Sequence, residues 1–291
     1  MQNNRGKLTP STSSKANWQI PQGVTASNWE YAQAKHIPSG YDKFLLGDPL
    51  TMVDREILDR YLPDRTSEIE KLSRASKPLV ADFGCGNGRT LIPLLNRGYA
   101  GVAIDLSIPM LNAFQKKIGI EPNRAKVASG SSQNGCLLIQ ANLVELDGIA
   151  NEAFDHGVSL FSTLGMIRGQ ENRQLFLKHA RRTIKSGGWF ILHAHNVWYQ
   201  LRHPGGLRWA LGNGIQAIRG KSEFGDRQSN YRGINNMFIH SFRRKELAKA
   251  LSLAGFRELD WFGVGPHQDK PVDDLPFGHP LRLVGWVVAC R

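Results

Sequence analysis

A turn with glycine at every second position is the part of this sequence best suited to hold a ligand; its glycines are Gly84, Gly86 and Gly88. The turn follows the apolar run 79–83, and glycine lets the backbone bend sharply there and approach a ligand without a Cβ atom in the way. Asp82 precedes the turn by two positions, and Asp105 follows its last glycine by 17 positions, at the end of a second apolar run. This spacing describes a βαβ unit in which the Asp105 carboxylate reaches the ribose hydroxyls of a bound nucleoside.

The same turn departs from the fingerprint of dinucleotide-binding proteins. That fingerprint requires Gly or Ala five positions after its first glycine, and Arg89 stands at this position here. Asp82 would also place a carboxylate beside a pyrophosphate at the N-terminus of the following helix, which is electrostatically unfavourable. The residues therefore favour a cationic nucleoside ligand and count against a nicotinamide-dependent oxidoreductase.

The segment 82–88 resembles the first motif of class I S-adenosylmethionine-dependent methyltransferases, and the segment 104–111 resembles their second motif. S-adenosylmethionine carries an ammonium and a sulfonium group and no phosphate, in agreement with the charge argument. The resemblance implies that Asp82 positions the amino-acid end of the cofactor, that the glycine turn passes beneath it, and that Asp105 binds the ribose. The cofactor-binding residues implied by these two motifs are Asp82, Gly84, Cys85, Gly86, Gly88, Asp105 and Leu106.

Two later segments resemble the motifs that complete the cofactor pocket in this family. Asn142 lies where these enzymes commonly place an acid against the adenine amine, and its amide oxygen can accept the same hydrogen bond while the backbone N–H of Leu143 donates to the ring. An ordinary loop asparagine is the alternative. The stretch 154–165 resembles the fourth motif, whose strand end and turn face the methyl group. The residues implied there are Ser162, Thr163 and Leu164, and the Asn-Pro-Pro-Tyr-type tetrapeptide of amino-group DNA methylases is absent.

Two histidines are candidates for a general base. Methyl transfer needs a nucleophile aligned with the sulfonium carbon, exclusion of water and, in some cases, a base for the departing proton. The expected strand 189–193 is followed by Ala194 and His195, and strand alternation places His193 and His195 on one face with His195 at the ligand edge. We predict His195 as the first candidate base and His240 as the second, with a structural histidine as the alternative for each. The three scattered cysteines predict neither a disulfide framework nor a metal site.

Short apolar strands and helical patterns alternate from residue 79 onward, and this alternation predicts an α/β fold with a doubly wound, mostly parallel sheet. The family resemblance implies a seven-stranded Rossmann-like sheet whose last strand is antiparallel. Ligands of such sheets bind at the carboxyl ends of the strands. The expected strands are 79–83, 102–105, 136–140, 156–161, 189–193, 256–264 and 283–290, and the expected helices are 88–96, 107–118, 170–185 and 243–253.

Composition divides the rest of the chain. Residues 1–29 contain no acid and are rich in Ser, Thr and Asn, which predicts a disordered tail, with a transit peptide as the alternative. The methyltransferase domain is expected over 30–291, with Tyr31 and Tyr41 packing in its core or stacking on the ligand. Within it we expect a helical cap at 30–77, a cofactor-binding core at 78–195, an insertion or lid at 196–236 and completion of the sheet at 237–291.

Charge and length bear on the partners. The chain of 291 residues has a formal net charge of +12, and its segment 201–245 holds nine Lys and Arg residues against two acids, with aromatic residues between them. This pattern fits either an RNA surface or a substrate lid with a solvated basic face. No run reaches membrane-spanning length and no secretory signal is evident, so we expect a cytoplasmic protein.

The residues and the resemblance together predict an S-adenosylmethionine-dependent methyltransferase that acts on an oxygen or nitrogen atom of a small molecule. The first alternative is a tRNA or rRNA methyltransferase that uses the basic segment 201–245. The second is a non-catalytic protein that binds an adenosyl ligand and regulates a partner. The acceptor and the oligomeric state have no signal in the sequence, because the fold does not determine the substrate.

Overall fold

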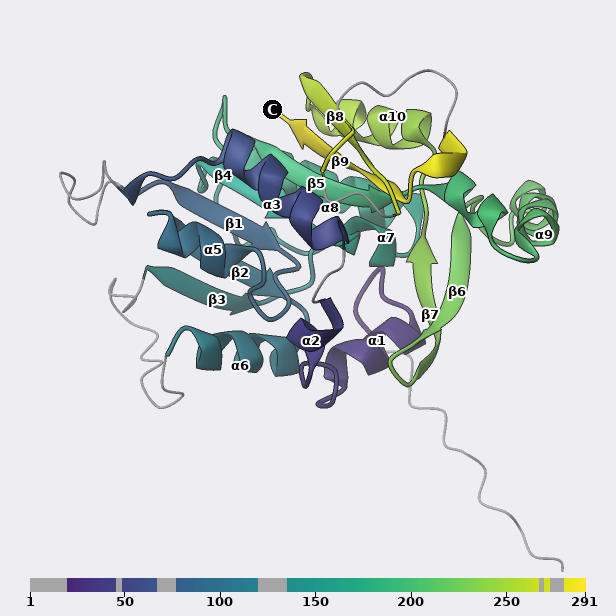
Figure 1. The fold of residues 1–291 in the computed structure, drawn as a ribbon, viewed down its shortest axis with the longest axis horizontal. Helices are drawn as coiled ribbons and strands as arrows, with labels where there is room; N and C mark the ends of the chain where they lie inside the picture. Colours follow the sequence, from purple (N-terminus) through teal and green to yellow (C-terminus); the bar gives the residue numbers. More distant parts are fainter. Residues whose placement is uncertain (1–19, 46–48, 67–76, 120–134, 267–269, 273–279) are drawn as a thin grey trace, which may run out of the picture.

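The computed structural model describes residues 20–45, 49–66, 77–119, 135–266, 270–272 and 280–291. Its centre is a seven-stranded sheet in the order β3-β2-β1-β4-β5-β9-β8 (Figure 1). The strands from β1 to β5 are parallel, whereas β9 is antiparallel to both β5 and β8. The predicted α/β sheet, including its antiparallel last strand, is therefore confirmed. The strands are β1 Leu79–Phe83, β2 Ala100–Asp105, β3 Cys136–Gln140, β4 His156–Ser159, β5 Phe190–His195, β8 Leu259–Val264 and β9 Gly285–Cys290.

Helices cover both faces of the sheet because successive strand residues point to opposite sides. In β1, Ala81 and Phe83 belong to one apolar cluster and Val80 to the other. The first cluster includes residues of α8 (Gln170–Thr183) and α10 (Arg244–Ala254). The second includes residues of three further helices, so the sheet is doubly wound as predicted. These are α3 (Pro49–Tyr61), α5 (Leu91–Asn96) and α6 (Ile108–Lys117).

The prediction of a disordered tail over 1–29 is wrong for residues 20–29, and residues 1–19 lie outside the described part. Helix α1 (Ala26–Gln33) begins in this segment, with the Thr25 hydroxyl accepting a hydrogen bond from the backbone N–H of Asn28. The buried side chain of Asn28 donates to the carbonyls of Met166 and Phe238 and accepts from the N–H of Phe238. These contacts join parts of the chain up to 210 positions apart, so no local sequence pattern indicates them.

The segment after β5 forms a separate layer at the carboxyl edge of the sheet (Figure 1). It consists of a 3-10 helix, η4 (Val197–Arg202), of α9 (Gly206–Ile218), and of an antiparallel hairpin of β6 (Asp226–Tyr231) and β7 (Ile234–His240). The predicted insertion ends at residue 236, but the hairpin continues to His240, so β7 belongs to this layer. Helix α7 (Thr163–Met166) packs against β7, and α2 (Tyr41–Leu45) follows α1 in the N-terminal segment. Among the described residues, no helix is long and apolar enough to cross a membrane.

Candidate functional site

A pocket of about 370 Å³ lies at the carboxyl ends of β1, β2 and β4, where ligands of doubly wound sheets bind. One side of the pocket consists of residues from the glycine turn and from the ends of β2 and β3. Further lining residues come from α1, from the turn after β4 and from the hairpin. The predicted site residues that line it are Gly84, Gly86, Asp105, Leu106, Asn142, Leu143, Thr163 and His195.

The three glycines of the turn all have positive φ angles, of 84°, 53° and 86°. A Cβ atom on Gly84 would lie 2.4 Å from Thr163 Cγ2, and one on Gly88 would lie 2.5 Å from Phe114 Cδ2. A Cβ atom on Gly86 would meet no atom within 4 Å, and Gly86 lines the pocket. Packing therefore requires glycine at positions 84 and 88, whereas Gly86 leaves room for the backbone to approach a ligand.

The Asp105 carboxylate at the end of β2 is held by backbone groups. Its Oδ2 atom accepts a hydrogen bond of 2.8 Å from the N–H of Gly86, and its Oδ1 atom accepts one of 2.8 Å from the N–H of Ser107. Burial raises the pKa of Asp105, while these hydrogen bonds oppose the rise. Each carboxylate oxygen can accept a further bond. The group is thus oriented beside the turn and fits a pair of ribose hydroxyls.

Asp82 is 2% exposed, and its Oδ2 atom has no hydrogen-bond partner among the described residues. Burial raises the pKa of Asp82 to about 7, although the charge of Arg89 opposes the rise. Asp82 does not line the pocket itself and lies one position inside the strand end. A buried carboxylate oxygen without a donor is unusual, and a cationic ligand end or a bridging water would satisfy it. The residues present therefore fit the cofactor that the sequence predicts.

Asn142 lies at the pocket and ties it to the N-terminal segment. Its amide donates to the carbonyl of Gln22 and to Glu145 Oε2, both at 3.0 Å. Its Oδ1 atom accepts a weak bond of 3.4 Å from the N–H of Val144, so an acceptor position is left for an adenine amine. Leu143 also lines the pocket. The pocket wall here depends on Gln22, a residue of the segment that was expected to be disordered.

The turn after β4 has strained backbone. Phe161 and Ser162 have φ angles of 59° and 62°, which are uncommon for residues other than glycine and occur mostly where the surrounding structure enforces them. The predicted strand to residue 161 is therefore too long, since β4 ends at Ser159. The turn directs Phe161 and Thr163 to the pocket, while Ser162 is fully buried and its Oγ atom accepts a bond of 3.3 Å from the N–H of His195.

Four predicted cofactor residues besides Asp82 do not line the pocket, and each has a packing role. The thiol of Cys85 is buried in the apolar cluster of α3, α5 and α6, and Gly88 contacts Phe114. Ser162 supports β5 through His195, and Leu164 belongs to the other apolar cluster. These four residues fix the shape of the two turns by packing. The neighbouring residues that line the pocket, and are placed to contact a cofactor, are Gly84, Gly86, Phe161 and Thr163.

His195, at the end of β5, lines the pocket as predicted. Burial lowers the pKa of His195 well below its ordinary value, and the neighbouring His193 and Arg227 lower it further. The two histidine rings lie 5.3 Å apart in a T-shaped arrangement. His193 is fully buried, and neither of its ring nitrogens has a hydrogen-bond partner among the described residues. At neutral pH, His195 is therefore an uncharged imidazole that lines the pocket.

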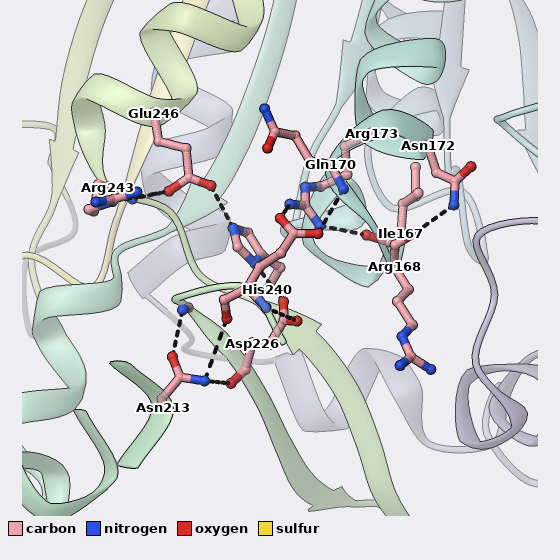
Figure 2. A network of polar contacts seen from close by, with 12 residues as sticks. Ile167, Arg168, Gln170, Asn172, Arg173, Asn213, Asp226, His240, Arg243 and Glu246 are labelled. Carbon is pink, nitrogen blue, oxygen red and sulfur yellow. Dashed lines mark hydrogen bonds and ion pairs between the residues drawn. The ribbon is translucent and has the colours of Figure 1, made fainter. Parts of the chain in front are cut away.

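His240 is excluded as a base by its contacts, so the prediction of a catalytic role for it is wrong. Figure 2 shows its ring between two carboxylates: Nδ1 lies 2.7 Å from Asp226 Oδ1 and Nε2 lies 2.8 Å from Glu246 Oε1. The ring is fully buried and does not line the pocket. Burial lowers the pKa of His240, but the two hydrogen bonds outweigh burial and raise it. Alternation along β7 turns Ile239 to the pocket and His240 away from it.

The network around His240 links four elements of the structure (Figure 2). Arg173 of α8 forms an ion pair with Glu223, which precedes β6, and also donates to the carbonyl of Ile167. Ligand atoms of Glu223, His240 and Glu246 all lie within 4.8 Å of one another, so this group could in principle hold a metal ion. The adjacent guanidinium and imidazole already compensate these carboxylates, and the arrangement is that of a structural network.

Arg227 of β6 is a pocket residue that the sequence analysis assigned only to a general basic segment. Its Nε atom is buried without a hydrogen-bond partner, and its Nη1 atom donates to Gln200 Oε1 at 3.3 Å. No ion pair of Arg227 is found among the described residues, and burial lowers its pKa. The only sequence signal was the basic character of 201–245, which does not distinguish a pocket arginine from a solvated one.

Comparison with known proteins agrees with this geometry. Residues 81–192 match the family model described as a methyltransferase domain. The chain has no significant match among curated proteins. A methyltransferase of Methanosarcina mazei, described as SAM-dependent, has 20% identity and a TM-score of 0.56, covering 80% of this chain and 95% of that one. The CcbJ methyltransferase of Streptomyces caelestis has 16% identity and a TM-score of 0.56, covering 89% and 98% respectively.

A third similar structure contains bound ligands. It is the 1,6-didemethyltoxoflavin-N1-methyltransferase of Burkholderia thailandensis with 1,6-didemethyltoxoflavin and S-adenosylhomocysteine, at 16% identity and a TM-score of 0.53, covering 94% of this chain and 92% of that one. At these identities the likeness concerns the fold. Residues 81–192 thus match a methyltransferase domain, and the seven-stranded sheet has the fold of these methyltransferase structures.

Proposed function

We propose that this chain is a class I S-adenosylmethionine-dependent methyltransferase and that it methylates an oxygen or nitrogen atom of a small, largely apolar ring compound that carries an anionic group. When bound, S-adenosylmethionine supplies an electrophilic methyl group. Asp105 and the backbone at Gly86 would hold its ribose, Asn142 and Leu143 its adenine, and the Asp82 carboxylate would compensate its ammonium group.

Aromatic and apolar side chains on the acceptor side of the pocket support a small ring compound. Tyr31 and Tyr231, whose ring centroids lie 5.9 Å apart, face this side together with Met166, Met237 and Ile239. Burial raises the pKa of Tyr31 well above its ordinary value, so its phenol remains a neutral hydrogen-bond donor. Apolar walls with a few polar groups are typical of small-molecule sites.

The proposal that the methyl acceptor has an anionic group rests on Arg227. Arg227 is half-buried, its Nε atom lacks a hydrogen-bond partner among the described residues, and a partly desolvated charge without an anionic partner is unfavourable. An acceptor carboxylate could supply the missing charge and bond to Nε, in the geometry that arginine prefers. Ser229 lies two positions along β6 and also lines the pocket, so it adds a hydroxyl on the same side.

His195 supports the placement of the reacting atom. Its neutral ring lies at the end of β5, next to the turn that presents Phe161 and Thr163 to the pocket. An uncharged imidazole can accept a hydrogen bond from the hydroxyl or amine that is to be methylated, and so orient its lone pair toward the methyl group. A full proton transfer to His195 in the transition state stays a prediction.

The RNA alternative has less support. Of the basic residues in 201–245, Arg227 faces the pocket, Arg232 donates to the carbonyls of Ile37 and Ser39, and Arg243 pairs with Glu246. These three side chains have partners or positions within the protein, so an RNA surface would have to rely on the exposed residues of the segment: Arg202, Arg208, Arg219, Lys221, Arg244 and Lys245. The alternative of a non-catalytic ligand binder is weakened because Thr163 and His195 border the same open pocket as the cofactor residues.

The test is a panel of phenols and aromatic amines that also carry a carboxyl group. Each compound is offered as the free carboxylic acid and as its methyl ester, and formation of S-adenosylhomocysteine is the readout. We expect methylation of one or more acids, and Arg227→Gln should raise the KM for the acid at least about tenfold while it leaves the ester unchanged. Arg227→Lys, which keeps the charge, serves as the matched variant and should recover part of the affinity. Equal use of acid and ester by the parent protein would contradict the role of Arg227.

A further inference from the structure

Helix α9 exposes an apolar face along its whole length. Leu207, Leu211, Ile215 and Ile218 are 67%, 63%, 50% and 89% exposed. At about 100° per residue, these four side chains fall within an arc of about 80°, so they form one continuous stripe, here called the α9 stripe. Exposed large hydrophobic residues elsewhere in the described chain occur singly on their elements, as Leu137 does on β3 and Leu253 on α10. A continuous stripe of this kind marks an interaction surface.

The other face of α9 is anchored, which fixes the direction of the stripe. The buried side chain of Asn213 accepts a hydrogen bond of 2.8 Å from the N–H of Gly225 and donates to the carbonyl of Asp226 at 3.1 Å. The Trp209 ring lies 6.3 Å from that of Phe224. Figure 1 places α9 at the edge of the molecule, beyond η4 and β6. The stripe therefore points away from the protein on a projecting helix.

Basic residues flank the α9 stripe. Arg208 and Arg219 are exposed and follow the stripe residues Leu207 and Ile218 directly, which places them along one side of the stripe. Arg202 before the helix and Lys221 after it are also exposed, and residues 201–222 contain no acid. An exposed apolar stripe beside cations, on a segment 201–222 without acids, is complementary to a surface that is apolar within and anionic outside.

We propose that α9 docks this protein on an anionic lipid membrane, with the stripe in the boundary between headgroups and acyl chains and the arginines at lipid phosphates. The 13 residues of α9 are too few to span a bilayer, so the helix would lie in the plane of the interface. RNA is a poorer partner because its phosphates would pair with the arginines but leave the apolar stripe exposed to water. A second copy is disfavoured because two facing stripes would bring the flanking arginines together.

The experiment is vesicle co-sedimentation of the full chain, which requires no methyl acceptor. We expect binding to mixed phosphatidylcholine–phosphatidylglycerol vesicles, weakening as salt is raised, and little binding to pure phosphatidylcholine vesicles. The double variant Leu207→Gln with Leu211→Gln should lose at least about tenfold in affinity. Its matched control changes two exposed leucines elsewhere, Leu137→Gln and Leu253→Gln, and should bind as the parent does.

The charged flank is tested separately. The double variant Arg208→Gln with Arg219→Gln should weaken binding to the anionic vesicles and reduce its salt dependence. The control is Arg55→Gln with Arg257→Gln, which removes two exposed arginines elsewhere and should weaken binding much less. The inference is overturned if the chain does not bind anionic vesicles, or if the stripe variant binds them as well as the parent. A concentration-dependent dimer that the stripe variant abolishes, without vesicle binding, would assign the stripe to a second copy. Binding of bulk tRNA without vesicle binding would likewise overturn it.

Discussion

The chemistry of this site depends on buried ionisable side chains whose pKa values differ from those in water. One carboxylate oxygen of Asp82 has no donor among the described residues, burial keeps His195 neutral, and Arg227 has no anionic partner in the described part of the chain. The first of these is complementary to a cationic cofactor end and the last to an anionic acceptor. The proposed ligands would compensate the first and the last of these groups, which is typical of sites that bind charged molecules.

The raised pKa of Asp82 predicts that cofactor binding depends on pH. With a pKa of about 7, the carboxyl group of the free protein is partly protonated at neutral pH, and a bound ammonium group favours its charged form. Affinity for S-adenosylhomocysteine should therefore fall as pH is lowered through 7, by up to about tenfold per pH unit, with release of a proton on binding. Calorimetric titration in buffers of different ionisation enthalpy measures both quantities.

Two variants separate Asp82 from an acid at the other end of β1 in this experiment. Asp82→Asn should abolish the pH dependence and weaken binding above pH 7. Asp155→Asn is the matched control, because the Asp155 carboxylate bonds to the N–H of Leu79 at the opposite end of β1 and to Lys185. An affinity of the parent protein that is constant between about pH 6 and pH 8 would contradict the role of Asp82.

A second prediction at this scale concerns His195. His195→Ala should lower kcat about a hundredfold with the acceptor found in the panel, because the nucleophile loses its orienting partner, while cofactor affinity changes little. His195→Gln, which keeps a hydrogen-bond acceptor, should be affected less. Steady-state kinetics and calorimetry measure the two effects, with the exposed His203→Ala as the control. Turnover that survives His195→Ala unchanged would leave this residue a purely structural role.

At the scale of elements, the position of the β6–β7 hairpin determines the acceptor side of the pocket. The hairpin carries Arg227, and it is held by His240 to α10 through Glu246. A Cβ atom on Gly165 of α7 would lie 2.5 Å from the backbone oxygen of His240, so the hairpin also packs closely on α7. The hairpin is thus fixed by a polar network and by close backbone contact, and Arg227 is positioned accordingly.

The His240 network predicts a pH-dependent contribution to stability. The folded-state pKa of His240 is raised, so its contribution is complete below the unfolded-state pKa and is lost as pH rises through the folded-state value. His240→Gln should lower the free energy of unfolding by about 2 kcal/mol near pH 6 and by less near pH 9. Urea unfolding followed by circular dichroism at the two pH values measures this difference. A loss that is equal at both values, or no larger than that of His203→Gln, would contradict it.

At the scale of the whole molecule, the two ligand sides of the pocket differ in how far the sequence predicts them. The cofactor side comes from 82–105, where strand, turn, helix and strand follow one another, so the glycines and Asp105 are recognisable by spacing alone. Even there, the tertiary structure decides which residues face the ligand: Gly86 does, whereas Gly88 is required by Phe114. Burial of Asp82 and its consequences for pKa also depend on packing from both faces of the sheet.

The sequence by itself determined the doubly wound sheet and the glycine turn with Asp105 at the pocket, because both arise from local periodicity and from contacts between neighbouring segments. The tertiary structure alone decided the acceptor side, which joins α1, the strained turn at Phe161, the end of β5 and the hairpin. These segments meet through long-range contacts such as the one between Asn28 and Phe238, and such contacts have no period along the chain. For the same reason, the basic segment resolved into a pocket arginine, structural arginines and a projecting amphipathic helix only once the chain was folded.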